Sequence, residues 1–156
     1  MNRFNLNLVL MVSLACFGIS TASAHDKKGT VSSAAGATDS YSIGCDTGFV
    51  TLQVRINDVL PVKPPRLRIT VEKDGQVASA IDSTDGDGKY SNPVTVTWGA
   101  GQYSVKVEKL AKGDKGASAS VKTKKYPEIY NMSYHCFNAQ NEHTEESTSL
   151  SIILNQ

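Results

Sequence analysis

Apolar and polar residues alternate through four stretches of this chain, and this period of two constrains the fold more than any other feature. Successive side chains of a β-strand point to opposite faces, so each stretch has one apolar and one polar face, as half-buried antiparallel strands do. The apolar positions are Val50, Leu52, Val54 and Ile56, then Leu67, Ile69 and Val71, then Val94, Val96 and Trp98, then Tyr103, Val105 and Val107. Weaker strand candidates cover 41–45, 117–123, 129–137 and 149–154.

Turn-forming residues separate these stretches. Asp74-Gly75 predicts a two-residue hairpin turn of type I′, because glycine adopts a positive φ at little cost. Pro61, Pro64 and Pro65 exclude a central strand where they stand. No stretch has the period of an amphipathic helix. About eight short strands separated by turns predict an all-β fold with one domain, an antiparallel β-sandwich of jelly-roll or immunoglobulin-like type.

The first 24 residues have the pattern of a secretory signal peptide. Arg3 supplies a positive charge, 6–19 is mostly apolar, and Ala22-Ser23-Ala24 is a small-x-small cleavage site. The apolar stretch is too short to span a membrane stably, so we expect no transmembrane segment. Cleavage after Ala24 would give a mature chain that begins at His25 and lies in the periplasm or outside the cell. The alternative is a lipid anchor at Cys16, although Ser13 stands where a lipoprotein box prefers Leu.

The residues after the predicted cleavage site divide into two parts. Residues 25–38 are small and polar, so they predict a flexible leader that buries too little surface to order itself. The sandwich domain is then expected to cover 39–156. Within it, Cys45 and Cys136 remain after Cys16 is removed, and two cysteines in an oxidising compartment predict one structural disulfide.

Charge argues against a polyanionic partner. The whole chain has 16 basic and 15 acidic residues, and Arg3 is the only charged residue in 1–24. A mature chain without net charge is a poor candidate to bind nucleic acid. We expect instead a protein or cell-envelope partner, bound through loops such as 57–66 and 82–93.

Two segments carry a family resemblance. Asp39-Ser40-Tyr41 opens a strand, and Gly101-Gln102-Tyr103-Ser104-Val105-Lys106-Val107 forms a later one. This order resembles the bacterial pre-peptidase C-terminal domain family over roughly residues 38–125. In addition, Thr84-Asp85-Gly86-Asp87-Gly88-Lys89-Tyr90 is similar to a turn of carboxypeptidase-regulatory-like modules. Both resemblances imply a non-catalytic extracellular β-sandwich module, and fold alone implies no more.

An acidic loop offers one candidate metal site. Asp82, Asp85 and Asp87 lie close together among glycines, and carboxylate oxygens are the ligands that Ca²⁺ prefers. The EF-hand register fails, however, because Val94 stands where the bidentate Glu belongs. Asp and Gly are equally typical of plain turns capped by side chains, which is the interpretation we favour.

A second candidate metal site uses the predicted mature N-terminus. The α-amine and imidazole of His25 together form a chelate that suits copper, and His135 or His143 can supply a further nitrogen. A flexible leader would deny this chelate a rigid scaffold, so the residue pattern favours a His25 without a ligand role.

No catalytic motif is present, such as a serine in a G-x-S-x-G elbow. We therefore expect a non-enzymatic module of the cell envelope without a cofactor, calcium being the alternative. A metal-binding envelope protein is the alternative function. A fimbrial or other assembly subunit is a further one, in which the apolar tail Leu150, Ile152 and Leu154 adds a strand to a neighbour.

Overall fold

The structure, a computed structural model, describes residues 25–34, 36–60, 66–84, 86–111 and 126–155. Nine strands lie in this part of the chain. They are β1 (His25–Val31), β2 (Thr38–Cys45), β3 (Phe49–Leu60), β4 (Leu67–Lys73), β5 (Gln76–Ile81), β6 (Val94–Val96), β7 (Gly101–Lys109), β8 (Glu128–Asn138) and β9 (Thr148–Leu154). A single 3₁₀ turn, η1 (Glu145–Ser147), precedes β9.

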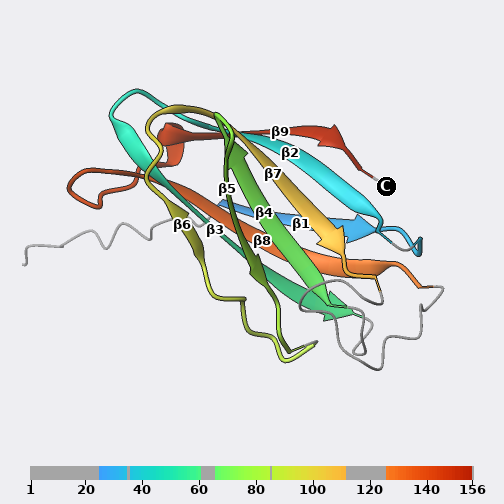
Figure 1. Cartoon of the computed structure of the whole chain (residues 1–156). Helices are drawn as coiled ribbons and strands as arrows, with labels where there is room; N and C mark the ends of the chain where they lie inside the picture. The colour runs from blue at the N-terminus through green and yellow to red at the C-terminus, as the bar shows by residue number, and fades with distance from the viewer. Residues whose placement is uncertain (1–24, 35, 61–65, 85, 112–125, 156) are drawn as a thin grey trace, which may run out of the picture.

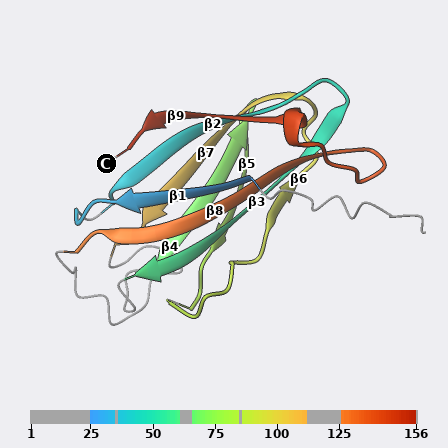
Figure 2. The same cartoon turned by 180° about the vertical axis from the view of Figure 1, so that it is seen from behind.

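The strands form two antiparallel sheets packed face to face, which confirms the predicted β-sandwich. One sheet has the order β1-β8-β3-β6 and the other has the order β5-β4-β7-β2-β9. Figures 1 and 2 show the two layers from opposite sides, and in Figure 2 the sheet with β1, β8 and β3 lies nearer to the viewer. Both sheets use strands from the beginning and the end of the chain, so neither half can complete a sheet alone.

The predicted apolar faces form the core between the two sheets. Leu52, Val54 and Ile56 of β3 are fully buried, and they face the equally buried Leu67, Ile69 and Val71 of β4 and Tyr103, Val105 and Val107 of β7. Val94 and Val96 are also buried, whereas Trp98 is only partly buried and packs at the margin. Strand alternation therefore identifies the inward face of each of these strands correctly.

The predicted disulfide is present and joins the sheets. Cys45 ends β2 in one sheet, Cys136 lies in β8 of the other, and their Cα atoms are 5.6 Å apart. Tyr41 of β2 and Tyr130 of β8 make a second link through their hydroxyl groups, which are 2.5 Å apart. Tyr130 also donates a hydrogen bond to the buried carboxylate of Asp39 at 2.7 Å. Strands β2 and β8 are thus tied twice across the core.

The predicted hairpin turn between β4 and β5 is confirmed. Asp74 and Gly75 both have positive φ, at 51° and 78°, as a type I′ turn requires. The neighbouring Lys73 closes another turn, because its ammonium group donates to the carbonyl oxygens of Trp98, Gly99 and Ala100 at 2.7, 3.1 and 2.7 Å. These bonds hold the entry to β7 against the β4–β5 hairpin.

The expected flexible leader is wrong for its first half. Residues 25–31 form β1, which pairs with β8 from His25↔Tyr134 to Val31↔Glu128. A Cβ atom at Gly29 would overlap the Tyr130 ring, so only glycine lets this ring lie against β1. Val31 and Ala37 are buried as well. Backbone pairing with β8 and contact with the Tyr130 ring order this segment, although its own side chains bury little apolar surface.

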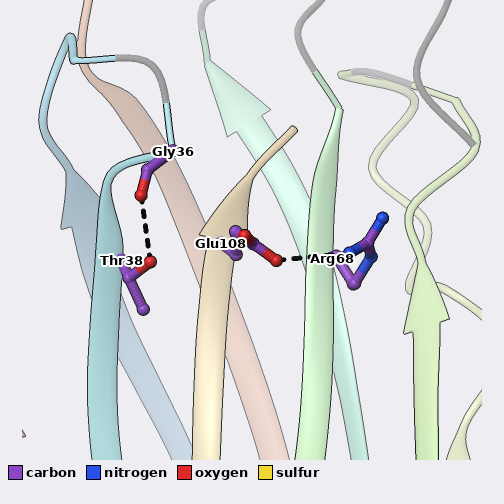
Figure 3. Close-up of polar contacts among 4 residues, drawn as sticks. All are labelled: Gly36, Thr38, Arg68 and Glu108. Carbon is purple, nitrogen blue, oxygen red and sulfur yellow. Dashed lines mark hydrogen bonds and ion pairs between the residues drawn. The ribbon is translucent and has the colours of Figure 1, made fainter. Parts of the chain in front are cut away.

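Surface contacts add little to this framework. Arg68 of β4 and Glu108 of β7 face each other as a cross-strand pair, with 3.4 Å between their charged groups (Figure 3). The same view shows Thr38 donating a hydrogen bond to the Gly36 carbonyl at the start of β2. Because both charged side chains are partly solvated, the ion pair contributes about 0–1 kcal/mol.

Strand β9 forms one edge of the five-stranded sheet. It pairs with β2, so the apolar tail completes its own sheet, but Ile152, Ile153 and Leu154 remain exposed. The candidate strand at 117–123 lies outside the described residues, as do Cys16 and the cleavage site at Ala24. No helix in the described ranges is long and apolar enough to cross a membrane.

We predict that loss of the disulfide lowers the free energy of unfolding by about 4 kcal/mol, because the bridge closes a loop between residues 91 positions apart. Guanidinium unfolding with and without reductant measures this difference. The paired variant Cys45→Ala/Cys136→Ala is the control, since its midpoint should not respond to reductant. Coincident midpoints for the unsubstituted protein would show that the bridge contributes nothing.

Candidate functional site

The chain has three histidines, and the fold brings all of them together. The ring centroids of His135 and His143 are 4.8 Å apart, those of His25 and His143 are 5.4 Å apart, and those of His25 and His135 are 6.1 Å apart. We call these three residues the histidine cluster. Each is only partly buried, so the cluster lies at the surface.

Three different elements supply the cluster. His25 is the first residue of β1, His135 lies in β8, and His143 lies in the loop that follows β8. Figure 2 shows that the start of β1 and the loop after β8 lie at the same end of the molecule. The register His25↔Tyr134 explains this, because it places the beginning of β1 beside the later half of β8.

Local hydrogen bonds fold the β8–β9 loop back toward His135. The side-chain oxygen of Asn138 accepts bonds from the backbone N–H groups of Gln140 and Glu142, at 3.0 and 2.8 Å. Asn141 adopts a left-handed φ of 62°, which asparagine tolerates better than most residues. This tight turn reverses the chain and places His143 over the ring of His135.

Side-chain contacts hold β1 in place beside the cluster. The ring of His25 stacks on Tyr134, with 5.5 Å between the centroids and 22° between the planes. On the other face of β1, Asp26 accepts a hydrogen bond from the Tyr90 hydroxyl at 3.4 Å. The Arg55 guanidinium in turn lies 4.6 Å from the centre of the Tyr90 ring. His25 therefore begins a strand that is fixed on both faces.

The ring nitrogens of the cluster are close enough to interact. His135 Nδ1 lies 3.4 Å from His143 Nε2, and His135 Nε2 lies 3.2 Å from the Ser133 hydroxyl. Nε2 of His25 is buried and has no hydrogen-bond partner in the described part of the chain. A buried nitrogen without a partner carries a desolvation cost that a bound ligand would offset.

Electrostatics favour the neutral form of at least one ring. Burial lowers the pKa of His135 below its ordinary value, and repulsion by His143, His25 and Arg55 lowers it further. Asp26 acts in the opposite direction but is the weakest of these influences. Neutral imidazole is the form that binds metal ions.

Three imidazoles are a ligand set that suits zinc or copper. As the rings stand, no three His, Cys, Asp or Glu side chains within the described ranges have the geometry of a metal site. The rings must therefore turn so that one nitrogen of each points to a common centre.

In the acidic loop, the two carboxylates that the structure describes accept backbone hydrogen bonds. Asp82 is buried and accepts hydrogen bonds from the backbone N–H groups of Asp58 at 2.8 Å and Thr84 at 3.2 Å. Asp87 is exposed and accepts one from the N–H of Lys89 at 2.8 Å. Asp85 lies outside the described residues. These bonds are those of side-chain-capped turns, and calcium binding by this loop stays a prediction.

Burial raises the pKa of Asp82 above its ordinary value, although its two backbone hydrogen bonds oppose the change. The folded protein thus binds this proton more tightly than the unfolded chain does. The resulting stabilisation is present at acid pH and is lost as pH rises through the folded-state pKa.

Comparison with known proteins finds no family model, no curated protein and no solved structure that matches this chain. The resemblance to pre-peptidase C-terminal domains therefore stays a prediction. Within the described residues, the histidine cluster brings together ionisable side chains from three separate elements at the surface.

We predict that Asp82→Ala lowers the free energy of unfolding by about 1–3 kcal/mol, because it leaves the buried N–H of Asp58 without its acceptor. Asp87→Ala is the matched control, and we expect it to change stability by less than about 0.5 kcal/mol because Asp87 is exposed. Thermal melts of both variants with and without Ca²⁺ provide the measurement. A large calcium-dependent rise in Tm that Asp87→Ala abolishes would contradict the turn interpretation.

Proposed function

We propose that this protein is an exported, non-enzymatic β-sandwich module that binds one transition-metal ion, copper in particular, through the histidine cluster. The observation that carries the proposal is the meeting of all three histidines of the chain within 6.1 Å, centroid to centroid, although they come from three separate elements. Imidazole nitrogens favour Cu²⁺ over the other divalent first-row ions.

The surroundings support a binding role. Phe137 lies 6.0 Å from both His135 and His143, and Tyr134 covers His25, so aromatic rings limit the access of water to the cluster. Ser133 contacts the ring of His135 and is placed to orient it, as groups around metal-bound histidines do.

The predicted export fits the same role. A disulfide such as Cys45–Cys136 persists in oxidising compartments, which agrees with the signal-peptide pattern of residues 1–24. An envelope protein meets metal ions outside the cytoplasm and can hold or carry them for a protein partner. The module would need no catalytic group for this work.

We predict that the chain beginning at His25, stripped of metal, binds one equivalent of Cu²⁺ and that His135→Ala or His143→Ala weakens binding at least about tenfold. Each variant removes one nitrogen ligand, and losses of even an outer-shell contact reach 10–100-fold. Calorimetric titration and electron paramagnetic resonance measure affinity and nitrogen ligation. Gln140→Ala, an exposed change on the loop of His143, is the matched control and should bind as the unsubstituted protein does.

Failure of the unsubstituted protein to bind Cu²⁺ or Zn²⁺ would overturn the proposal. So would unchanged affinity in both histidine variants, provided that circular dichroism shows them folded. Gly29→Val adds a test of position, because a side chain there meets the Tyr130 ring and displaces β1. This variant should weaken metal binding although it changes no ligand.

Assembly through β9 is a second candidate function. The exposed fractions of Ile152, Ile153 and Leu154 are 51%, 63% and 40%, and among the described strands β9 has a partner on one side only. Such an edge can pair with the same edge of a second copy. Light scattering over a range of concentrations should then show dimers that Ile153→Lys dissociates, whereas a monomer at all concentrations would exclude this assembly.

A further inference from the structure

We infer that signal-peptide cleavage completes the metal site, so that the precursor binds copper weakly and the mature protein binds it tightly. This inference rests on the proposed function and extends it to the regulation of the same site. Cleavage after Ala24 would free the α-amine of His25, the residue with which β1 begins. The amine then becomes a fourth nitrogen beside the three imidazoles.

Covalent geometry allows the amine and the imidazole of His25 to bind the same metal ion. The amine nitrogen and Nδ1 of the same histidine are joined through Cα, Cβ and Cγ, so a metal ion bound to both closes a six-membered ring. Rotation about the bonds of the His25 side chain brings Nδ1 to the metal. In the precursor, the same backbone nitrogen belongs to a planar peptide bond, where resonance removes its lone pair from use as a ligand.

The fold supplies what an N-terminal chelate ordinarily lacks, which is a fixed position. Chain termini are usually poorly ordered unless a strand or helix ties them down. Here His25 pairs with Tyr134 in the β1–β8 ladder, its ring stacks on Tyr134, and Asp26 is held by Tyr90. A mature N-terminus at this point would stand directly beside His135 and His143.

The fourth nitrogen also changes which metal is preferred. Three imidazoles and a water molecule satisfy the tetrahedral geometry of Zn²⁺. A set of one amine and three imidazoles satisfies the tetragonal nitrogen geometry that Cu²⁺ favours. We therefore expect the amine to strengthen binding of Cu²⁺ more than binding of Zn²⁺, so that processing selects copper.

The decisive comparison uses two chains of identical composition. One is the chain 25–156 with a Gly-Ser linker of about six residues before His25, which turns the amine into a peptide nitrogen and keeps His25 away from the third position, where a free N-terminus would itself chelate Cu²⁺. The other is its matched control, in which the same linker follows Gln156 and the amine of His25 stays free. Both are produced folded, with the disulfide formed, and stripped of metal before titration.

We expect the linker before His25 to weaken Cu²⁺ binding on the order of 10²-fold, because it removes a donor held at high effective concentration. The affinity for Zn²⁺ should change by less than about threefold, which in free energy is much less than the change expected for Cu²⁺. Nitrogen hyperfine structure in the Cu²⁺ resonance spectrum should fall from four nitrogens to three. Equal Cu²⁺ affinity in the two chains would overturn the inference.

The outcomes separate this inference from the proposed function. Equal affinities that are both lowered by His135→Ala leave the histidine cluster as a metal site and refute the role of the amine. Tight binding by the free amine that neither His135→Ala nor His143→Ala weakens refutes the cluster and leaves a simple terminal chelate. Absence of Cu²⁺ binding in both chains refutes both.

Discussion

The structure depends on the double link between β2 and β8, which face each other across the core. The Cys45–Cys136 bridge joins them covalently, and the Tyr41–Tyr130–Asp39 hydrogen bonds join them further along the same strands. Buried hydroxyl and carboxylate groups are costly unless they are paired, so this network forms as a unit or not at all. The two links set how one sheet lies on the other.

Strand β8 bears both the residues that make these links and a histidine of the surface cluster. Its inward residues, Tyr130 and Cys136, make the links, whereas His135 points to the opposite face of the same strand. Because neighbouring residues of a strand lie on opposite faces, the position of His135 follows from the position of Cys136. Tyr130 also covers Gly29 and so helps to seat β1, which carries His25. One strand therefore fixes two of the three histidines.

Alternation predicted the strands that have one buried face, because there the side chains report the structure directly. It missed β1, whose residues from His25 to Thr30 are mostly polar. An edge strand of this kind is held by its backbone and by a neighbour's ring, and neither produces an alternation of apolar and polar residues in its own sequence. The residue pattern offered His25 with His135 or His143 as nitrogen ligands, but it did not predict the strand β1 that brings them together. His25 had a chemical role available from sequence, but only the β1–β8 register brings it to His135.

Lys73 has a consequence for the chemical reactivity of the protein. Its three N–H donors all form hydrogen bonds with the carbonyl oxygens of three consecutive residues. The uncharged amine of a lysine attacks acylating reagents through its lone pair, so exposed lysines such as Lys28 and Lys89 should react long before Lys73 does. The rate at which Lys73 is labelled would then report how often the turn at 98–100 opens.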